Sequence, residues 1–148
     1  MQIILFRPEI PQNTGNIIRT CFLTNSNLSI VTPASFSLTD RNLKRAGLDY
    51  FKDVNLEKIE NLEKYLLDKK SFYFFSSKAK KSYSDVNYEK NAILIFGSET
   101  SGLPKVFFDK YRDKFLTIPM KKDSRCLNLS NSVSIVLYEA LRQNNFSF

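Results

Sequence analysis

Short apolar runs recur along this chain, separated by polar residues or by segments whose apolar positions repeat with helical spacing. The runs are Gln2–Phe6 (QIILF), Leu28–Thr32 (LSIVT), Phe72–Ser76 (FYFFS), Ala92–Phe96 (AILIF) and Phe115–Ile118 (FLTI). FYFFS and AILIF do not alternate apolar with polar residues, which is typical of strands with both faces covered. Alternating strands and helices therefore predict an α/β fold, with a mostly parallel sheet and helices on both faces.

The segments between the runs predict helices from their capping residues and apolar spacing. No repeat, linker or low-complexity tract interrupts the chain, so we expect one domain over residues 1–148. The expected helices run from Asn13 or Thr14 as N-cap to about Asn25, from Thr39 or Asp40 to Ala46, through Ile59, Leu62, Leu66 and Leu67 to about Lys70, from Pro104 to about Lys110, and from Ser130 as N-cap along the apolar stripe Val133, Val136, Leu137, Ala140 and Leu141.

The chain contains no histidine, and this absence excludes several kinds of catalysis. A Ser-His-Asp triad, a Cys-His dyad and an HExxH zinc site cannot form within it. The net charge is +7, and cations gather at Arg41–Arg45, Lys78–Lys81 and Lys121–Arg125. Charge alone leaves two interpretations open, a polyanionic partner or a solvated surface rich in lysine.

The two cysteines, Cys21 and Cys126, lie far apart and show no CxxC or Cys/His spacing. We therefore expect no disulfide framework and no metal site, and we expect both cysteines to be small, fairly buried residues. No apolar run approaches the ~18 residues that span a bilayer, and the N-terminus lacks a signal-peptide pattern. These features predict a protein of the reducing cytoplasm without membrane association.

Two turns rich in glycine, serine and asparagine, FGSETSGLP (Phe96–Pro104) and SRCLNLSNS (Ser124–Ser132), each follow an apolar run and lead into a helix. Because parallel strands end at one edge of a sheet, we expect both turns to line one ligand cleft. Neither GxxxxGK[ST] nor GxGxxG is present, so a P-loop or the usual dinucleotide site is unsupported. Glu99 has two open interpretations, direct chemistry or a carboxylate that binds loop amides.

The segment PEIPQNTGNIIRT (Pro8–Thr20) stands where a dinucleotide-binding turn would be. A helix from about Thr14 places Asn16 and Arg19 on neighbouring positions of one face. Taken alone, this pattern favours an N-capped helix with a polar exposed side over a functional site.

Four motifs together closely resemble a known family: PEIPQNTGNIIRT, RAGLDY (Arg45–Tyr50), FGSETSGLP and IPMKKDSRCLNLSNSVSIVLYEALRQ (Ile118–Gln143). They are similar to the SPOUT methyltransferases, and within them to the TrmH-like tRNA (cytidine/uridine-2′-O-)-methyltransferases of the TrmL (YibK-like) type. The resemblance implies transfer of a methyl group from S-adenosylmethionine to the ribose of the wobble nucleotide of tRNA. It also implies a homodimer and a C-terminal deep trefoil knot, which no spacing argument predicts.

The same resemblance implies which residues form the site. Arg19 matches the arginine to which related enzymes assign activation of the 2′-hydroxyl, and Asn16 would position the same group. Because a guanidinium stays protonated far above pH 7, stabilising an alkoxide or binding a phosphate is the easier role for Arg19. Tyr138 matches a tyrosine linked with activity or RNA binding, and packing between subunits is the alternative. The implied cofactor residues are Phe75, Gly97, Ile118 and Cys126, with Glu99, Met120, Leu127 and Ser130 nearby.

The chain carries no extra RNA-binding domain, so we expect its own basic residues to hold tRNA. Lys121, Lys122 and Arg125 are the candidates for phosphate contacts. The alternatives are a non-catalytic RNA-binding protein, a SPOUT enzyme that acts on rRNA or another tRNA position, and an oxidoreductase of the doubly wound type. The missing GxGxxG disfavours the oxidoreductase.

Overall fold

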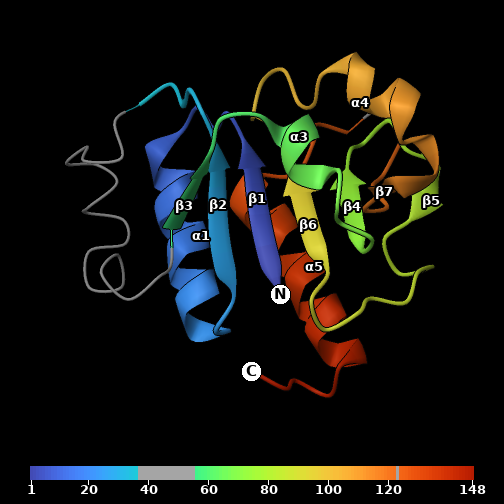
Figure 1. The fold of residues 1–148 in the computed structure, drawn as a ribbon. Helices are drawn as coiled ribbons and strands as arrows, with labels where there is room; N and C mark the ends of the chain where they lie inside the picture. The colour runs from blue at the N-terminus through green and yellow to red at the C-terminus, as the bar shows by residue number, and fades with distance from the viewer. Residues whose placement is uncertain (37–55, 123) are drawn as a thin grey trace.

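The computed structural model describes residues 1–36, 56–122 and 124–148, which form one parallel sheet with helices on both of its faces (Figure 1). The sheet has seven strands in the order β3-β2-β1-β6-β4-β7-β5, and its paired strands all run parallel. The predicted α/β sheet with helices on both faces is confirmed. The strands are β1 (Gln2–Phe6), β2 (Asn27–Val31), β3 (Leu56–Ile59), β4 (Phe72–Phe75), β5 (Lys81–Ser82), β6 (Ile93–Phe96) and β7 (Phe115–Thr117).

Helices on the two faces bury both sides of the central strands. Two long helices, α1 (Pro11–Leu23) and α5 (Leu129–Gln143), pack against each other and lie behind the sheet in Figure 1. Two short helices, α3 (Leu62–Leu66) and α4 (Lys105–Lys110), cover the other face, and the 3-10 turn η1 (Arg112–Lys114) follows α4. None of the helices in the described residues is long and apolar enough to cross a membrane.

The central strand β1 shows why its sequence does not alternate. Ile3 and Leu5 pack into the core shared with α1 and α5, whereas Ile4 packs into the core on the opposite face. Apolar residues are therefore needed at the three successive positions Ile3, Ile4 and Leu5, as predicted for strands covered on both sides.

Two helices begin at residues other than the predicted ones. Helix α1 starts at Pro11, with Ile10 as its N-cap, so Asn13 and Thr14 lie inside its first turn. Proline suits this position because the first-turn N–H that it lacks has no partner within the helix. Helix α5 starts after Asn128, whose side chain accepts a hydrogen bond from the Ser130 N–H. The predicted N-caps at Asn13 or Thr14 and at Ser130 are therefore wrong.

The helix predicted through Ile59 to Lys70 is only partly correct. Ile59 ends strand β3, and α3 begins three residues later behind the N-cap Asn61. Leu62 and Leu66 are buried, whereas Leu67 is 74% exposed, because the helix ends before it. The apolar residues of a strand and of the helix that follows it thus happened to have the spacing of a single helix. The helix predicted from Thr39 or Asp40 to Ala46 lies outside the described residues.

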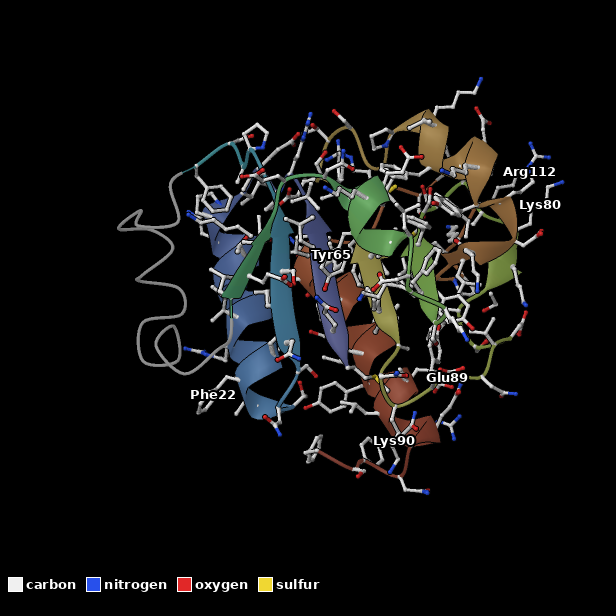
Figure 2. All side chains as sticks on the ribbon, in the orientation of Figure 1. Phe22, Tyr65, Lys80, Glu89, Lys90 and Arg112 are labelled. Atoms are coloured by element: carbon white, nitrogen blue, oxygen red, sulfur yellow. The ribbon has the colours of Figure 1, made fainter. Side chains whose placement is uncertain are left out.

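Helix α3 is attached to the sheet by a polar side chain. The hydroxyl of Tyr65, labelled on the front of the molecule in Figure 2, donates to Gln2 Oε1 of β1 at 3.1 Å. Ser29 of β2 accepts from Gln2 Nε2 at 2.7 Å, so one glutamine joins a helix to two strands.

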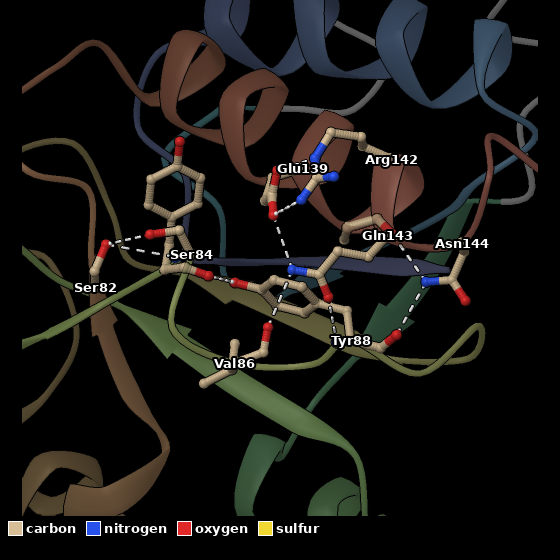
Figure 3. Close-up of polar contacts among 10 residues, drawn as sticks. Ser82, Ser84, Val86, Tyr88, Glu139, Arg142, Gln143 and Asn144 are labelled. Carbon is tan, nitrogen blue, oxygen red and sulfur yellow. Dashed lines mark hydrogen bonds and ion pairs between the residues drawn. The ribbon is translucent and has the colours of Figure 1, made fainter.

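The loop after β5 is fastened to the end of α5 by side chains that bind its backbone (Figure 3). Gln143 Oε1 accepts from Tyr88 N at 2.9 Å, and Gln143 Nε2 donates to Val86 O at 3.1 Å. Asn144 Nδ2 donates to Tyr88 O at 2.9 Å. These bonds hold the loop that leads from β5 to β6 against the helix.

We expect this attachment to weaken in acid because of Glu139. Hydrogen bonds from Arg142, and then from Gln143, hold the pKa of the Glu139 carboxyl below its ordinary value of 4.5. A carboxyl with a lowered pKa stabilises the folded state above that ordinary value, and the stabilisation is lost as the pH falls through the folded pKa. Thermal unfolding followed by circular dichroism should therefore show a smaller acid-induced drop in Tm for Glu139→Gln than for the natural protein. Equal drops below pH 4.5 would contradict this account.

Candidate active site

A cavity of about 510 Å³ opens at the edge of the sheet where β4, β6 and β7 end. Its size is within the range of pockets that bind small molecules. The two polar turns singled out in the sequence both line it, so the predicted cleft between them is confirmed. The lining consists of Ile10, Asn13, Phe75–Lys78, Phe96–Leu103, Thr117, Ile118, Met120, Cys126–Leu129 and Ser132.

The loop after β6 folds back on itself, and this requires glycine at its first position. Ser98 N donates to Gly102 O at 3.2 Å, and Gly102 N donates to Ser98 O at 3.0 Å. A Cβ atom on Gly97 would lie 2.3 Å from the Gly102 carbonyl carbon and 2.6 Å from Leu103 N. Since a side chain at Gly97 would collide with backbone, glycine allows this loop to close beside the cavity.

The carboxylate of Glu99 ties this loop to the start of α1. Its oxygens accept from Glu9 N at 2.8 Å, from Ile10 N at 3.2 Å and from Asn13 Nδ2 at 2.9 Å. In return, Glu9 Oε2 accepts from Thr100 Oγ1 at 2.7 Å and Thr100 N at 3.1 Å, which holds the pKa of Glu9 below its usual value. Glu99 therefore binds amides, one of the two predicted interpretations. Its contact with a cofactor stays a prediction.

Asn13 connects Glu99 to the start of α5, and we call the set Glu99, Asn13 and Asn128 the Asn13 bridge. Asn13 is 5% exposed, and its Oδ1 accepts from Asn128 Nδ2 at 2.8 Å. Asn128 Oδ1 in turn accepts from Ser130 N at 2.8 Å and from Ser130 Oγ at 2.7 Å. Because both ends of the Asn13 amide are used, its orientation is fixed, and three separate segments are held at one place.

Apolar side chains form another part of the cavity lining. Phe75 is buried and stacks on Phe96 with ring centroids 4.7 Å apart. Ile118, Met120 and Leu127 continue this apolar part. The predicted cofactor residues thus come together around one cavity. Ser130 is the exception, because it is outside the lining and its buried hydroxyl faces Asn128.

The two cysteines occupy different environments. Cys21 is buried in α1, and burial raises the pKa of its thiol to about 12. Cys126 is exposed in the segment before α5, where its Sγ donates to Ser77 Oγ at 3.5 Å, so the prediction of two buried cysteines is wrong for Cys126. Within the described residues no three of His, Cys, Asp and Glu gather to hold a metal, and the absence of a metal cofactor stays a prediction.

The family model of the SpoU rRNA methylases matches residues 1–138. The chain belongs to the SpoU rRNA methylase family. A tRNA (cytidine(34)-2′-O)-methyltransferase from Methylovorus glucosotrophus (strain SIP3-4) is 41% identical over 148 residues, which cover 98% of this chain and 96% of that protein.

Solved structures resemble this SpoU chain as well. One, described as "Structural insights into the 2-OH methylation of C/U34 on tRNA", is 35% identical with a TM-score of 0.90 and covers 97% of this chain and 95% of that chain. The SpoU methyltransferase AviRb from Streptomyces viridochromogenes, in complex with the cofactor AdoMet, has a TM-score of 0.86 at 21% identity. It covers 98% of this chain and 60% of that chain, and shows that the fold is shared.

The three residues of this SpoU chain that were predicted to be catalytic lie outside the cavity lining. Asn16 and Arg19 are exposed on α1, and Tyr138 on α5 is 47% exposed. Helical spacing puts them on the surface of the α1–α5 layer that faces away from the sheet. We call this surface the outer face, and its exposed residues include Gln12, Asn16, Arg19, Leu23, Ile135 and Tyr138. The structure therefore brings these three residues to one side of the layer, apart from the predicted cofactor residues.

The predicted RNA contacts of this SpoU protein lie beside the cavity. Lys121, Lys122 and Arg125 are exposed in the segment between β7 and α5. Met120 and Cys126, which belong to the same segment, both line the cavity, whereas the three cations do not. Their part in RNA binding stays a prediction.

Sequence reasoning about this SpoU site missed two sets of lining residues. Asn13 was assigned to capping, although it joins the three segments. Ser76, Ser77 and Lys78 follow β4 and form one side of the cavity. The sequence did contain a signal for Ser76, Ser77 and Lys78, because they come directly after the apolar run that forms β4. Since β4 is parallel to β6, the residues after both strands lie at the same edge of the sheet.

Glu99→Gln should loosen the loops around the cavity. Glutamine turns one acceptor oxygen into an amino group that faces donors, and an unsatisfied donor costs about 1–3 kcal/mol. We expect Tm to fall by roughly 2–12 °C in calorimetry, given the size of the domain. Thr100→Ser is the matched control in the same loop, because serine keeps the hydroxyl that donates to Glu9. A Glu99→Gln protein as stable as the control would show that the carboxylate bonds contribute little.

Proposed function

We propose that this protein is an S-adenosylmethionine-dependent tRNA 2′-O-methyltransferase that acts on the wobble cytidine or uridine of the anticodon loop. The observation that carries the proposal is the likeness over 98% of the chain to a tRNA (cytidine(34)-2′-O)-methyltransferase. The cavity supports it, because three of the four motifs of the family resemblance contribute to its lining.

The residues around the cavity fit S-adenosylmethionine as the methyl donor. Phe75, Ile118 and Leu127 offer an apolar wall for a flat base, and the backbone of residues 97–102 offers hydrogen-bonding groups. Glu99 and Lys78 add one charge of each sign to the lining, which suits a donor that carries both a carboxylate and cationic groups. The donor supplies a methyl group already activated on a sulfonium, so the protein mainly has to align it with the ribose oxygen.

The location of Arg19 supports a site completed by two subunits. Arg19 is on the outer face, away from the cavity of its own chain. The outer face also exposes Leu23 at 59%, Ile135 at 36% and Tyr138 at 47%. Apolar side chains exposed together are typical of surfaces that contact another subunit. We therefore propose a homodimer formed through this face, in which Arg19 of the partner subunit completes the cavity.

Arg19 acts on the substrate hydroxyl through its charge. A guanidinium keeps its protons at physiological pH, so it stabilises the negative charge that develops on the 2′-oxygen, or binds the neighbouring phosphate. The 2′-oxygen would gain the methyl group as the bond between that carbon and the sulfonium sulfur breaks, which would leave the donor as a neutral thioether, and the hydroxyl proton would pass to solvent. Asn16, one turn earlier on α1, positions the same group. Tyr138 contacts the RNA or packs between the subunits.

The remaining parts of the proposal concern the RNA, the knot and the location. A net charge of +7 and the exposed Lys121, Lys122 and Arg125 suit binding of phosphates. The shared fold supports the C-terminal trefoil knot that the resemblance implies. We further infer a cytoplasmic location, because the proposed substrate is tRNA.

Incubation with tRNA from cells that lack the protein, in the presence of donor with a labelled methyl group, tests the function. We expect label on the ribose of the wobble nucleotide, identified by mass spectrometry of nuclease fragments. Label in rRNA or at another tRNA position would instead assign the protein to a related SPOUT activity. RNA binding with no methyl transfer to any RNA would identify a non-catalytic RNA-binding protein.

A further inference from the structure

A second cavity, of about 630 Å³, lies at the edge of the sheet formed by β5. One side comes from the residues between β4 and β5, and the other side comes from α4, η1 and the start of β7. We call this cavity the basic cleft. The residues that matter for its chemistry are Lys78, Lys80, Lys81, Phe108, Arg112 and Phe115.

The basic cleft concentrates positive charge that is available to a ligand. Lys78, Lys80, Lys81 and Arg112 are all exposed, and Asp113 is the acidic residue in the lining. The ion pairs found within the described residues are Lys69 with Asp68, Lys110 with Glu63 and Arg142 with Glu139. The four cations of the cleft thus belong to none of them. Figure 2 shows Lys80 and Arg112 reaching outward at the same edge of the molecule.

Aromatic rings hold one of these cations in place. The guanidinium of Arg112 lies over the ring of Phe108, 5.8 Å from its centroid. Phe108 in turn packs edge-on against the buried Phe115 at a centroid distance of 4.9 Å. A guanidinium held on a ring loses less freedom when it binds, and its planar fork matches the oxygens of a phosphate.

The basic cleft continues directly from the active-site cavity. Lys78 lines both of them, and Ser76 and Ser77 line the active-site cavity just before it. The stretch from Ser76 to Lys81 therefore runs out of one cavity and into the other. A polynucleotide with one ribose in the active-site cavity must leave it on some side, and this side offers positive charge.

We propose that the basic cleft binds phosphates of the RNA strand that flanks the nucleotide to be methylated. The inference rests on the proposed function, because it takes RNA as the substrate. Exposed lysines spread along an open groove suit successive backbone phosphates, which position a nucleic acid without reading its sequence. The cleft therefore adds affinity and register, while the active-site cavity does the chemistry.

Fluorescence anisotropy with a labelled anticodon stem–loop RNA tests the inference on the full-length protein. The Lys80→Ala/Arg112→Ala double variant should bind at least roughly tenfold more weakly, because each lost bond joins a charged pair. The slope of log affinity against log salt should become shallower by roughly 1.4, since each lost contact to a single strand removes about 0.7. The Michaelis constant for tRNA should rise in parallel.

The matched control is Lys64→Ala/Lys90→Ala, which removes two exposed charges outside the basic cleft and should leave the slope near its natural value. Equal slopes and equal affinities for the two double variants, with matching Tm values, would overturn the inference. Competition by polyglutamate that depends on Lys80 and Arg112, without any loss of RNA affinity, would do so too, because it indicates an acidic protein partner.

The experiments distinguish an error in the proposed role of the basic cleft from an error in the proposed function. If the natural protein binds the stem–loop through Lys80 and Arg112 but transfers no methyl group, the cleft stands and the proposed activity does not. If the natural protein methylates tRNA and the two double variants behave alike, the activity stands and the cleft does not.

Discussion

Arg19→Ala should lower methyl transfer to tRNA by at least about a hundredfold, the usual loss when one stabilising donor is removed from a reacting oxygen. The binding of S-adenosylmethionine should stay nearly intact, because Arg19 does not line the cavity of its own chain. Single-turnover transfer and isothermal titration with the donor measure the two effects separately. Lys64→Ala, which removes an exposed cation from α3 on the opposite face of the sheet, is the control and should retain full activity. Unchanged turnover in Arg19→Ala would remove this residue from the mechanism.

Mixed dimers decide whether Arg19 acts across the subunit boundary. Leu127→Arg introduces a bulky charged side chain at a cavity position that is 40% exposed, so it should block the donor without unfolding the domain. Each variant alone should be inactive. A dimer of one Arg19→Ala chain and one Leu127→Arg chain should regain one working site, because the intact cavity then meets the intact Arg19 of the partner subunit. No recovery in verified mixed dimers would place Arg19 and the cavity of the same chain in one site.

Gly97→Ala should abolish donor binding and strongly destabilise the protein. Its Cβ would lie 2.3 Å from the carbonyl carbon of Gly102, and backbone cannot move aside as a flexible side chain can. Forced overpacking of this kind costs about 3 kcal/mol. We therefore expect Tm to fall by roughly 6–12 °C, and titration with S-adenosylmethionine to show no heat of binding.

Gly102→Ala is the matched comparison within the same loop. Gly102 has a φ of +67°, yet nothing lies within 4 Å of its Cβ position. The left-handed conformation alone costs roughly 1–2 kcal/mol, so the expected loss is smaller than at Gly97. A larger loss at Gly102 than at Gly97 would contradict the collision as the cause.

The strands of this fold were predictable where burial decides the sequence. AILIF and FYFFS are apolar at nearly every position because both of their faces meet a core. Strand β5 was not predicted because it is a polar pair of residues at the sheet edge. Strand β3 was hidden because Ile59 falls in helical register with Leu62. Both errors concern short strands that form because they pair with a strand elsewhere in the sequence, β3 with β2 and β5 with β7, and the local pattern of apolar residues does not reveal such pairing.

The site residues that directly follow strands were predictable from the sequence. The residues whose partners come from other helices, strands or loops were harder to predict. Gly97 and Glu99 come directly after an apolar run, and the strand-end rule placed them correctly. The second cavity needed three dimensions, because Lys80 and Arg112 are far apart in sequence and meet only when β5 packs beside β7. Local pattern also gave no reason for Asn13 to be buried, since its partners Glu99 and Asn128 come from two later segments.

The Asn13 bridge has a consequence for the order in which the chain folds. Its two hydrogen bonds join residues that are 86 and 115 positions apart in sequence. Contacts of such long range form slowly, because the chain loses the entropy of closing a large loop before the contacts contribute any favourable energy. The ligand site is therefore assembled late, together with the pairing of β1 and β6, which also joins residues far apart in sequence. A chain that has formed its helices but has not yet joined these segments has no site for a methyl donor. Recovery of donor binding after dilution from denaturant should lag behind recovery of helical secondary structure.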